Sequence, residues 1–244
     1  MHEKEYHPRL DLNSLRLNQQ RIILGSFPIW SLSANLQAHH NNDNNAVAQD
    51  AVKKKEFPYF YGSSKNKFWS WYKTYFDVDV LPSNVESIKN SLQSNHIGIT
   101  DVILSCKRKG KSSLDKDLYQ RTYNLNFFLY PKLNETLKIL CTSKGVMNEM
   151  LLCNEFFTIH TKLKLNQINS EIHQKRFIEK TNGDPSLIRK PIFIELNVES
   201  GGKIQCLSIP SPGSPYRKLN DFGIFEVSNL DTYLIEAFNW LKDQ

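Results

Sequence analysis

RIILGSFP, residues 21–28, is typical of a buried strand that stops abruptly. Ile22 to Leu24 form a short apolar run, and Gly25 and Ser26 end it just before a proline. Other stretches are rich in apolar and β-branched residues of the same kind, at 98–106, 137–143, 191–198 and 204–210. A Gly-Gly turn joins the last two, which predicts a pair of neighbouring strands.

Helical patterns separate these strands. Residues 66–76 carry large rings at helical spacing, and Ser83 lies three residues before Glu86, which is a capping-box pattern for a helix over 83–96. Further helices are expected to open at 112–119, to run from 144 to 157, and to close the chain at 230–244. Alternating strands and helices predict an α/β fold with a mainly parallel central sheet covered on both faces.

Length and composition fit one globular domain over residues 1–244, and we expect a monomer. The chain is 40% hydrophobic and 23% charged, and no stretch reaches the roughly 20 apolar residues that cross a bilayer. The polar N-terminus lacks an apolar leader region, so we expect a cytoplasmic protein with no membrane partner. Asn-rich residues within 33–56 predict a mobile insertion, and residues 158–190 are expected to be an irregular excursion.

No cofactor or metal is expected. The four cysteines are widely spaced without a CxxC pair, and no HxxxH or HExxH motif is present, so reduced thiols are the simplest interpretation. The net charge of +6 permits binding to a polyanion. Positive charge gathers at Lys107, Arg108, Lys109 and Lys111, which we interpret as a basic loop, and near Lys65.

Loops that follow the strands should lie together, because ligands of parallel sheets bind beyond the carboxyl ends of the strands. The three such loops are residues 25–28, 106–114 and 210–217. In the last, prolines stiffen the backbone while Ser211, Gly213 and Ser214 leave amides and hydroxyls free, a composition suited to following a phosphate backbone. A simple Pro/Ser turn is the alternative.

The segment FPYFYGSSKNKFW (57–69) places six rings beside a polar turn. A buried strand would exclude its lysines and a surface loop would exclude its rings, so it is either a core segment or the wall of a pocket.

Five segments, taken in order, resemble the motifs of the uracil-DNA glycosylase superfamily, and most of all its hypoxanthine-DNA glycosylase-like branch, with the mismatch-specific uracil glycosylases further off. They are GSFPIWSL (25–32), YGSSKNKFW (61–69), GITDVILSCKRKGKSSLDKDL (98–118), ILCTSKGVMNEML (139–151) and IPSPGSP (209–215).

The resemblance implies a three-layer α/β/α fold and a monofunctional DNA glycosylase of base excision repair. Such an enzyme flips a deaminated base, of the uracil or hypoxanthine class, out of DNA and hydrolyses its N-glycosidic bond. Tyr61 falls at the stacking ring of the family, and Asn66 falls at an asparagine linked to catalysis. These two side chains are expected to face a shared cavity.

The remaining site residues follow from the same motifs. Substrate binding is expected at Gly25, Ser26, Phe27, Tyr61, Phe68, Ser211 and Ser214. Contacts to DNA carrying a damaged or mismatched base are expected at Lys65, Lys107, Arg108, Lys109, Lys111, Ser211, Gly213 and Arg217.

This sequence departs from the family at two polar positions. Phe27 occupies the place of an Asp or Asn that activates water in many members, and Ile209 occupies the place of a histidine that stabilises the departing base. A catalytically weak or inactive nucleic-acid-binding protein on the same fold is therefore the alternative. Asp101 and Asp115 are further acidic candidates, although local capping roles explain both. An unrelated α/β enzyme that binds a phosphorylated ligand ranks last.

Overall fold

A computed structural model describes most of the chain: residues 4–7, 20–27, 59–81, 84–110, 115–124, 135–152 and 163–243. The expected mobile insertion at 33–56 lies outside the described residues, as do Lys111, Ser83 and Cys153.

The central sheet of the described chain has six strands in the order β3-β2-β6-β9-β8-β7. β2 pairs in parallel with β3 and β6, and β6 pairs in parallel with β9, whereas β8 and β7 add antiparallel at one edge. The bounds are β2 Arg21–Gly25, β3 Ile97–Asp101, β6 Thr136–Cys141, β7 Leu163–Leu165, β8 Phe193–Val198 and β9 Lys203–Ser208. The predicted mainly parallel sheet is thus confirmed.

A second, three-stranded sheet has the order β1-β4-β5, with β1 Lys4–Tyr6, β4 Ile103–Arg108 and β5 Leu118–Tyr123. The expectation of one continuous strand over 98–106 is wrong, because the chain changes sheets at Val102. The backbone N–H groups of Val102 and Ile103 donate to the carbonyls of Gly25 and Ser26, so the change of sheet lies directly beside the end of β2. We refer to this change of sheet as the fork.

The predicted helix opening at 112–119 is also wrong in its described part. A 3₁₀ turn, η1 (Asp115–Asp117), leads into β5, which pairs antiparallel with β4. Cross-strand pairing outweighs the local helix-start pattern of serines and acids there.

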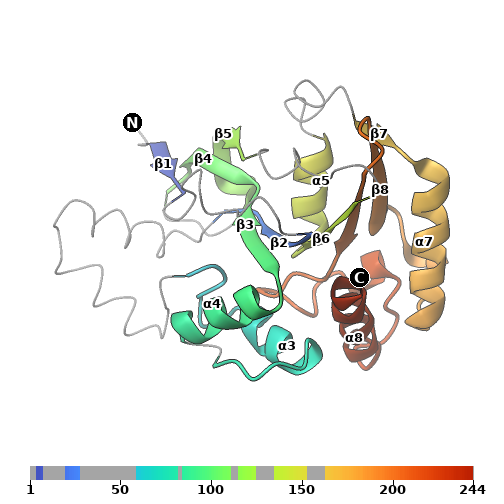
Figure 1. The fold of residues 1–244 in the computed structure, drawn as a ribbon. Coiled ribbons are helices and arrows are strands. Elements are labelled where there is room, and N and C mark those ends of the chain that lie inside the picture. Colours follow the sequence, from blue (N-terminus) through green and yellow to red (C-terminus); the bar gives the residue numbers. More distant parts are fainter. Residues whose placement is uncertain are drawn as a thin grey trace, which may run out of the picture.

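Helices cover both faces of the central sheet (Figure 1), an arrangement compatible with a three-layer sandwich. α3, α4 and α8 lie below the sheet in that view, and α5 and the small sheet lie above it. Neighbouring strand residues alternate between two cores, so that Ile23 packs on the α3 and α8 side and Ile22 and Leu24 pack on the α5 side. The bounds are α3 Phe68–Tyr75, α4 Val85–Ser94, α5 Lys144–Leu152 and α8 Asn229–Lys242.

These helices match the predicted ones except in detail. Asn84, not Ser83, is the N-cap of α4, and its side chain accepts a hydrogen bond from the Ser87 N–H. None of the described helices is long and apolar enough to cross a membrane.

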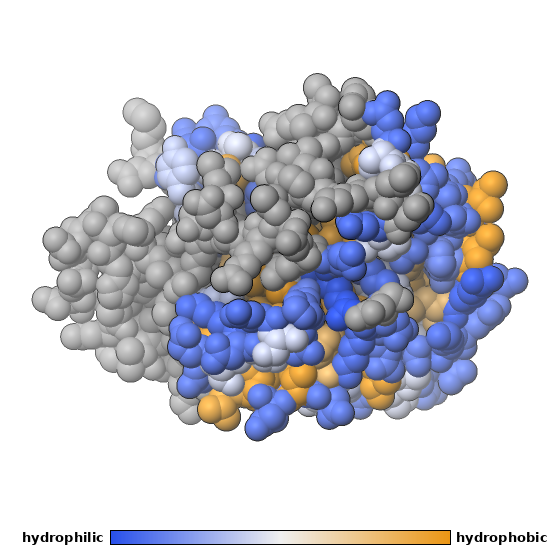
Figure 2. All heavy atoms as spheres, viewed as in Figure 1, coloured by the Kyte–Doolittle hydropathy of each residue, from blue (hydrophilic) through white to orange (hydrophobic). Residues whose placement is uncertain are grey.

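The segment expected to be irregular, residues 158–190, is ordered in its described part. It contains β7, the helix α7 (Gln167–Lys180) and the 3₁₀ turn η3 (Pro185–Leu187). Its helix has a polar sequence with little periodicity. Its buried apolar residues, Phe177 and Ile178, lie near its end, and Ser170 is buried near its start. Apolar surface remains beside α7 (Figure 2), where Leu165, Ile168 and Ile172 are exposed.

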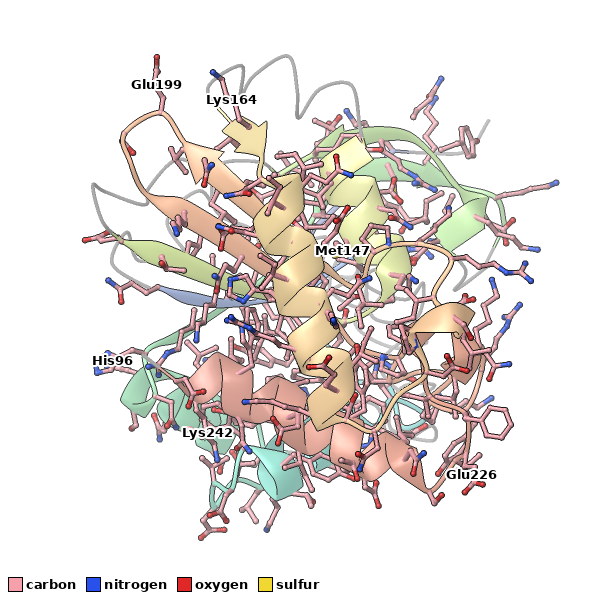
Figure 3. All side chains as sticks on the ribbon, turned by 90° about the vertical axis from the view of Figure 1, so that its right-hand side faces the viewer. His96, Met147, Lys164, Glu199, Glu226 and Lys242 are labelled. Atoms are coloured by element: carbon pink, nitrogen blue, oxygen red, sulfur yellow. The ribbon has the colours of Figure 1, made fainter. Side chains whose placement is uncertain are left out.

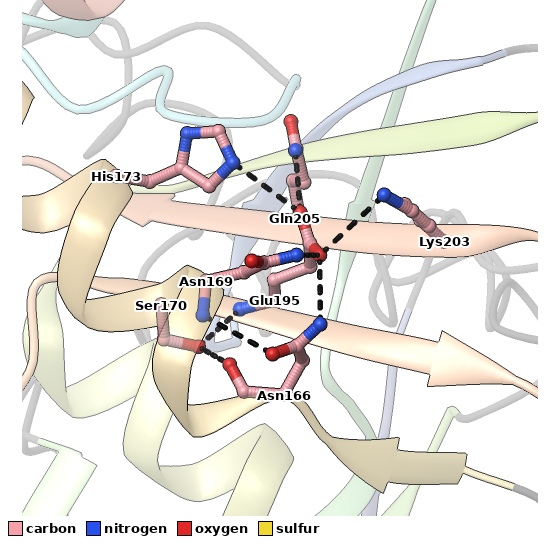
Figure 4. A network of polar contacts seen from close by, with 7 residues as sticks. All are labelled: Asn166, Asn169, Ser170, His173, Glu195, Lys203 and Gln205. Carbon is pink, nitrogen blue, oxygen red and sulfur yellow. Dashed lines mark hydrogen bonds and ion pairs between the residues drawn. The ribbon is translucent and has the colours of Figure 1, made fainter.

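A buried carboxylate joins α7 to the sheet (Figure 4). The Glu195 side chain is fully buried and accepts hydrogen bonds from the amides of Asn169 (2.7 Å), Gln205 (2.8 Å) and Asn166 (3.3 Å). Burial acts to raise the pKa of Glu195, but these hydrogen bonds, with the nearby charges of Lys203 and His173, outweigh it, so the pKa is lowered. Glu195 is therefore an ionised anchor between α7 and β8.

Candidate functional site at the carboxyl edge of the sheet

The carboxyl ends of β2, β6 and β9 bring three loops to one edge. The Ile209 N–H donates to the Cys141 carbonyl, so the loop after β9 begins beside the end of β6. The Lys67 N–H donates to the Pro212 carbonyl at 3.0 Å, which fixes the turn over residues 61–67 against the same loop. Two of the three loops predicted for this edge, those after Gly25 and Ile209, are therefore near the aromatic segment.

The surroundings of Tyr61 show whether the aromatic segment 57–69 belongs to the core or lines a pocket. Its ring packs on Phe68 (centroids 4.6 Å apart) and lies 6.2 Å from Trp69, so most of the segment belongs to the core beneath the edge. Its backbone has φ 55°, a left-handed conformation that is uncommon for a residue with a bulky side chain.

The Tyr61 hydroxyl is buried and has no hydrogen-bond partner among the described residues. Thr142 lies nearby and acts to lower the pKa of Tyr61, and its own hydroxyl donates to the Leu24 carbonyl at 3.1 Å. Burial, and then the charge of Asp101, raise the pKa of Tyr61 well above its usual value, so the phenol is neutral. A strained backbone and an unsatisfied hydroxyl in one residue are features that gather at functional sites.

Because Gly25 has no side chain, the Tyr61 hydroxyl can lie close to its backbone. A Cβ on Gly25 would overlap with Asp101 Oδ1 and would lie 2.5 Å from the Tyr61 hydroxyl oxygen. Three parts of the chain, the ends of β2 and β3 and the Tyr61 turn, therefore meet at this glycine.

His7 is a further residue at this edge, and no sequence motif indicated it. Its Nε2 lies 2.9 Å from Asp101 Oδ2, and both side chains are almost fully buried. The ring stacks on Phe60 (5.4 Å) and meets Phe27 edge-on (5.7 Å). No local pattern could have paired residues 7 and 101, because the contact depends on β1 joining β4 in the small sheet.

Asn66 has a structural role at the start of α3. Its Oδ1 accepts a hydrogen bond from the Phe68 N–H at 2.9 Å, which satisfies a donor at the start of α3. No hydrogen bond joins Asn66 to Tyr61, and among described residues its amide nitrogen has no partner and can donate to a ligand.

Phe27 and Phe68 are buried, Phe68 completely, so they support the edge from inside. Ser26 donates a hydrogen bond to Asp115 Oδ1 at 2.8 Å, which ties the end of β2 to η1. Loss of hydration raises the pKa of the Asp115 carboxyl, although the Ser26 hydrogen bond acts in the opposite direction and the residue as a whole is exposed.

Ser211 and Ser214 close a turn, in which the Ser214 N–H donates to the Ser211 carbonyl. Gly213 and Ser214 are exposed in this turn.

The predicted basic loop is wrong for its first two residues. Lys107 and Arg108 belong to β4, and Arg108 is buried, with its Nε 3.0 Å from Glu5 Oε1 and its guanidinium 5.7 Å from the centre of the Phe27 ring. Arg108 is therefore an internal ion-pair partner. Lys109, Lys65 and Arg217 are exposed.

The described cysteines, Cys106, Cys141 and Cys206, are buried free thiols. Within the described ranges no three His, Cys, Asp or Glu side chains lie together in a way that could hold a metal ion.

Comparison with known proteins finds no matching family model, no matching curated protein and no matching solved structure.

Proposed function

We propose that this protein is a DNA glycosylase that hydrolyses the N-glycosidic bond of a flipped, deaminated base, on a uracil-DNA glycosylase-like three-layer fold. The observation that carries the proposal is the hydrogen bond from the Lys67 N–H to the Pro212 carbonyl. It joins the turn that carries Tyr61 and Asn66 to the Pro/Ser loop, at the sheet edge where Gly25 ends β2.

In the proposed reaction water attacks C1′ of the nucleotide. The C1′–N bond breaks with its electron pair on the base, the water oxygen bonds to C1′, and the water proton passes to solvent. Asn66 donates from its free amide nitrogen to the base or orients the water, and backbone amides near Gly25 and Ser211 to Ser214 stabilise the charge on the leaving base.

The test uses oligonucleotides that carry uracil, hypoxanthine or xanthine, followed by alkaline cleavage of abasic sites. We expect base release by the natural protein in the presence of EDTA, and its loss in Asn66→Ala. Because Asn66 also accepts from the Phe68 N–H at the start of α3, Asn66→Asp is the sharper variant: it keeps that acceptor but lacks the amide donor. Asn220→Ala, at an exposed position, is the matched control and should keep full activity. No release from any of the three substrates by the natural protein would refute the proposal.

A non-catalytic nucleic-acid-binding protein is the second candidate. The buried apolar side chains of Phe27 and Ile209, at positions where the family carries polar groups, favour it. Salt-dependent binding of DNA without base release would support this candidate.

A further inference from the structure

We propose that exposed cations on three separate segments form one surface, the basic arc, which binds the phosphodiester backbone of a nucleic-acid strand. This inference rests on the proposed function for the identity of the polyanion. The arc consists of Lys65, Lys67, Arg189, Lys190, Arg217 and Lys218, all of them exposed. Of these, the sequence motifs indicated only Lys65 and Arg217.

The first link in the arc joins the aromatic turn to the loop after β9. Lys67 donates its N–H to Pro212, and five residues further on Arg217 donates its N–H to the Ser214 carbonyl at 3.0 Å. Lys65 and Lys67 therefore belong to a turn that lies beside the Pro/Ser loop, and Arg217 and Lys218 follow that loop in the chain.

The second link runs through Lys144, at the start of α5. Its Nζ donates to the Asp221 carbonyl (2.8 Å) and to the Lys190 carbonyl (2.6 Å), and it lies 5.6 Å from the centre of the Phe222 ring. Lys144 thus links the segment that carries Arg189 and Lys190, before β8, to the turn η4 (Leu219–Phe222), which directly follows Lys218.

Charges of both signs act on Lys144. Burial, the largest cause, lowers the pKa of Lys144 to about 8, the charge of Asp221 acts in the opposite direction, and the smaller effect of Lys190 adds to the lowering. Lys190 is therefore close enough to Lys144 for its charge to act there, beside the segment that follows Lys218.

Among the described residues, cations of the arc lack carboxylate partners, a property that they share with Lys109, Lys116 and Lys164 but not with several other lysines. None of the six forms an ion pair with a described residue, whereas Lys73, Lys89, Lys175, Lys180 and Lys203 each lie within 4.0 Å of a carboxylate. Two acids lie near the far end: Asp221, and Asp184, whose carboxylate accepts from the Ser186 N–H.

An exposed aromatic side chain and a rigid backbone favour nucleic acid over other polyanions as the ligand of the arc. Tyr216, which is 67% exposed, lies directly between Pro215 and Arg217, and base stacking on such rings accompanies phosphate contacts in nucleic-acid grooves. The loops also lie at the same edge as the candidate site, at the end of the molecule away from the β8–β9 turn. In Figure 3, Glu199 of that turn and Glu226, which follows η4, project from opposite ends.

The test measures binding of an undamaged fluorescent oligonucleotide by anisotropy over a range of salt concentrations. Two double variants remove two arc charges each, Arg189→Gln with Lys190→Gln, and Lys67→Gln with Arg217→Gln. Each lost phosphate contact should lower the slope of log Kd against log salt by about 0.7 to 0.9. Lys175→Gln with Lys180→Gln removes the same charge from α7 and is the matched control, with an unchanged slope apart from a small effect of net charge.

The arc is overturned if both arc variants keep the slope of the control, or if the natural protein does not bind the oligonucleotide at low salt. Binding of anionic lipid vesicles by the natural protein but not of the oligonucleotide would assign the arc to a membrane surface and equally overturn the proposal. Base release by the natural protein, measured separately, distinguishes this inference from the proposed function. A lowered slope in the arc variants without base release supports the arc and refutes the glycosylase. Base release with an unchanged slope supports the glycosylase and refutes the arc.

Discussion

At the scale of single residues, the Tyr61 hydroxyl is the least well satisfied group at the candidate site. A buried hydroxyl without a partner costs about 1–3 kcal/mol, whereas a typical satisfied one contributes about 1 kcal/mol. We expect Tyr61→Phe to raise the free energy of unfolding by about 1 kcal/mol, measured by urea denaturation.

Tyr233→Phe is the matched control, because the Tyr233 hydroxyl is buried and donates to the Ser208 carbonyl at 2.7 Å. Its removal should lower the free energy of unfolding by about 1–2 kcal/mol. Equal losses in the two variants would mean that the Tyr61 hydroxyl has a partner in solution.

Gly25 gives a second prediction at this scale. Gly25→Ala would place a methyl group on Asp101 and Tyr61, so we expect a loss of about 1–3 kcal/mol in thermal or urea unfolding and, on the proposed function, reduced base release. Gly145→Ala is the control: it lies in α5, where the new Cβ would lie 3.4 Å from the Ser143 Oγ, and alanine favours a helix by up to about 1 kcal/mol. A tolerated Gly25→Ala would show that the turn at Tyr61 can move.

At the scale of elements, Glu195 determines how firmly α7 is attached to the sheet. Because folding lowers the pKa of Glu195, its contribution is complete above its ordinary pKa of 4.5 and is lost as the pH falls through the lowered value. Glu195→Gln replaces one of the two carboxylate oxygens, which accept from Asn169 and from Gln205, by an NH2 group that can only donate. We therefore expect a loss of about 2–3 kcal/mol near pH 7 that shrinks in acid.

Urea denaturation at several pH values measures this, with Glu179→Gln as the control. Glu179 is on the same helix and forms only an exposed pair with Lys175, so its loss should cost less than about 0.5 kcal/mol. A pH-independent loss in Glu195→Gln would show that packing, not charge, attaches the helix.

Elements with strong periodicity could be predicted from the sequence, and elements defined by remote pairing could not. Ile22 to Leu24, the 137–143 stretch and the closing helix carry patterns that need no partner to interpret. The fork at Val102, β5 and the β1 strand depend on which segments meet, and the local sequence around Asp115 favours a different structure.

The same division holds for the site. Gly25, Tyr61, Asn66 and the Pro/Ser loop stand in motifs and could be singled out, although the capping role of Asn66 was not anticipated. His7 is 94 residues from Asp101, and Arg108 looked exposed in a lysine-rich run because Glu5, its partner, lies 103 residues away.

At the scale of the whole molecule, the fork couples the two sheets. β1 is held by β4 and places His7 on Asp101, at the end of β3, so opening of the small sheet should remove His7 from the edge of the large one. We expect Asp101→Asn to speed amide hydrogen exchange in β1 and β4 and to leave β8 and β9 unchanged. Exchange altered equally in every strand would indicate a global loss of stability instead.

The carboxyl edge is assembled from segments spread between His7 and Arg217, and the hydrogen bond between Lys67 and Pro212 spans most of that distance. Contacts of such high sequence separation form late, because a long loop must close before they repay its entropy. During synthesis the aromatic turn therefore meets its partner only after residue 212 has been made, and a nascent chain that stops before β9 has the core rings but lacks the Pro/Ser loop that completes the edge.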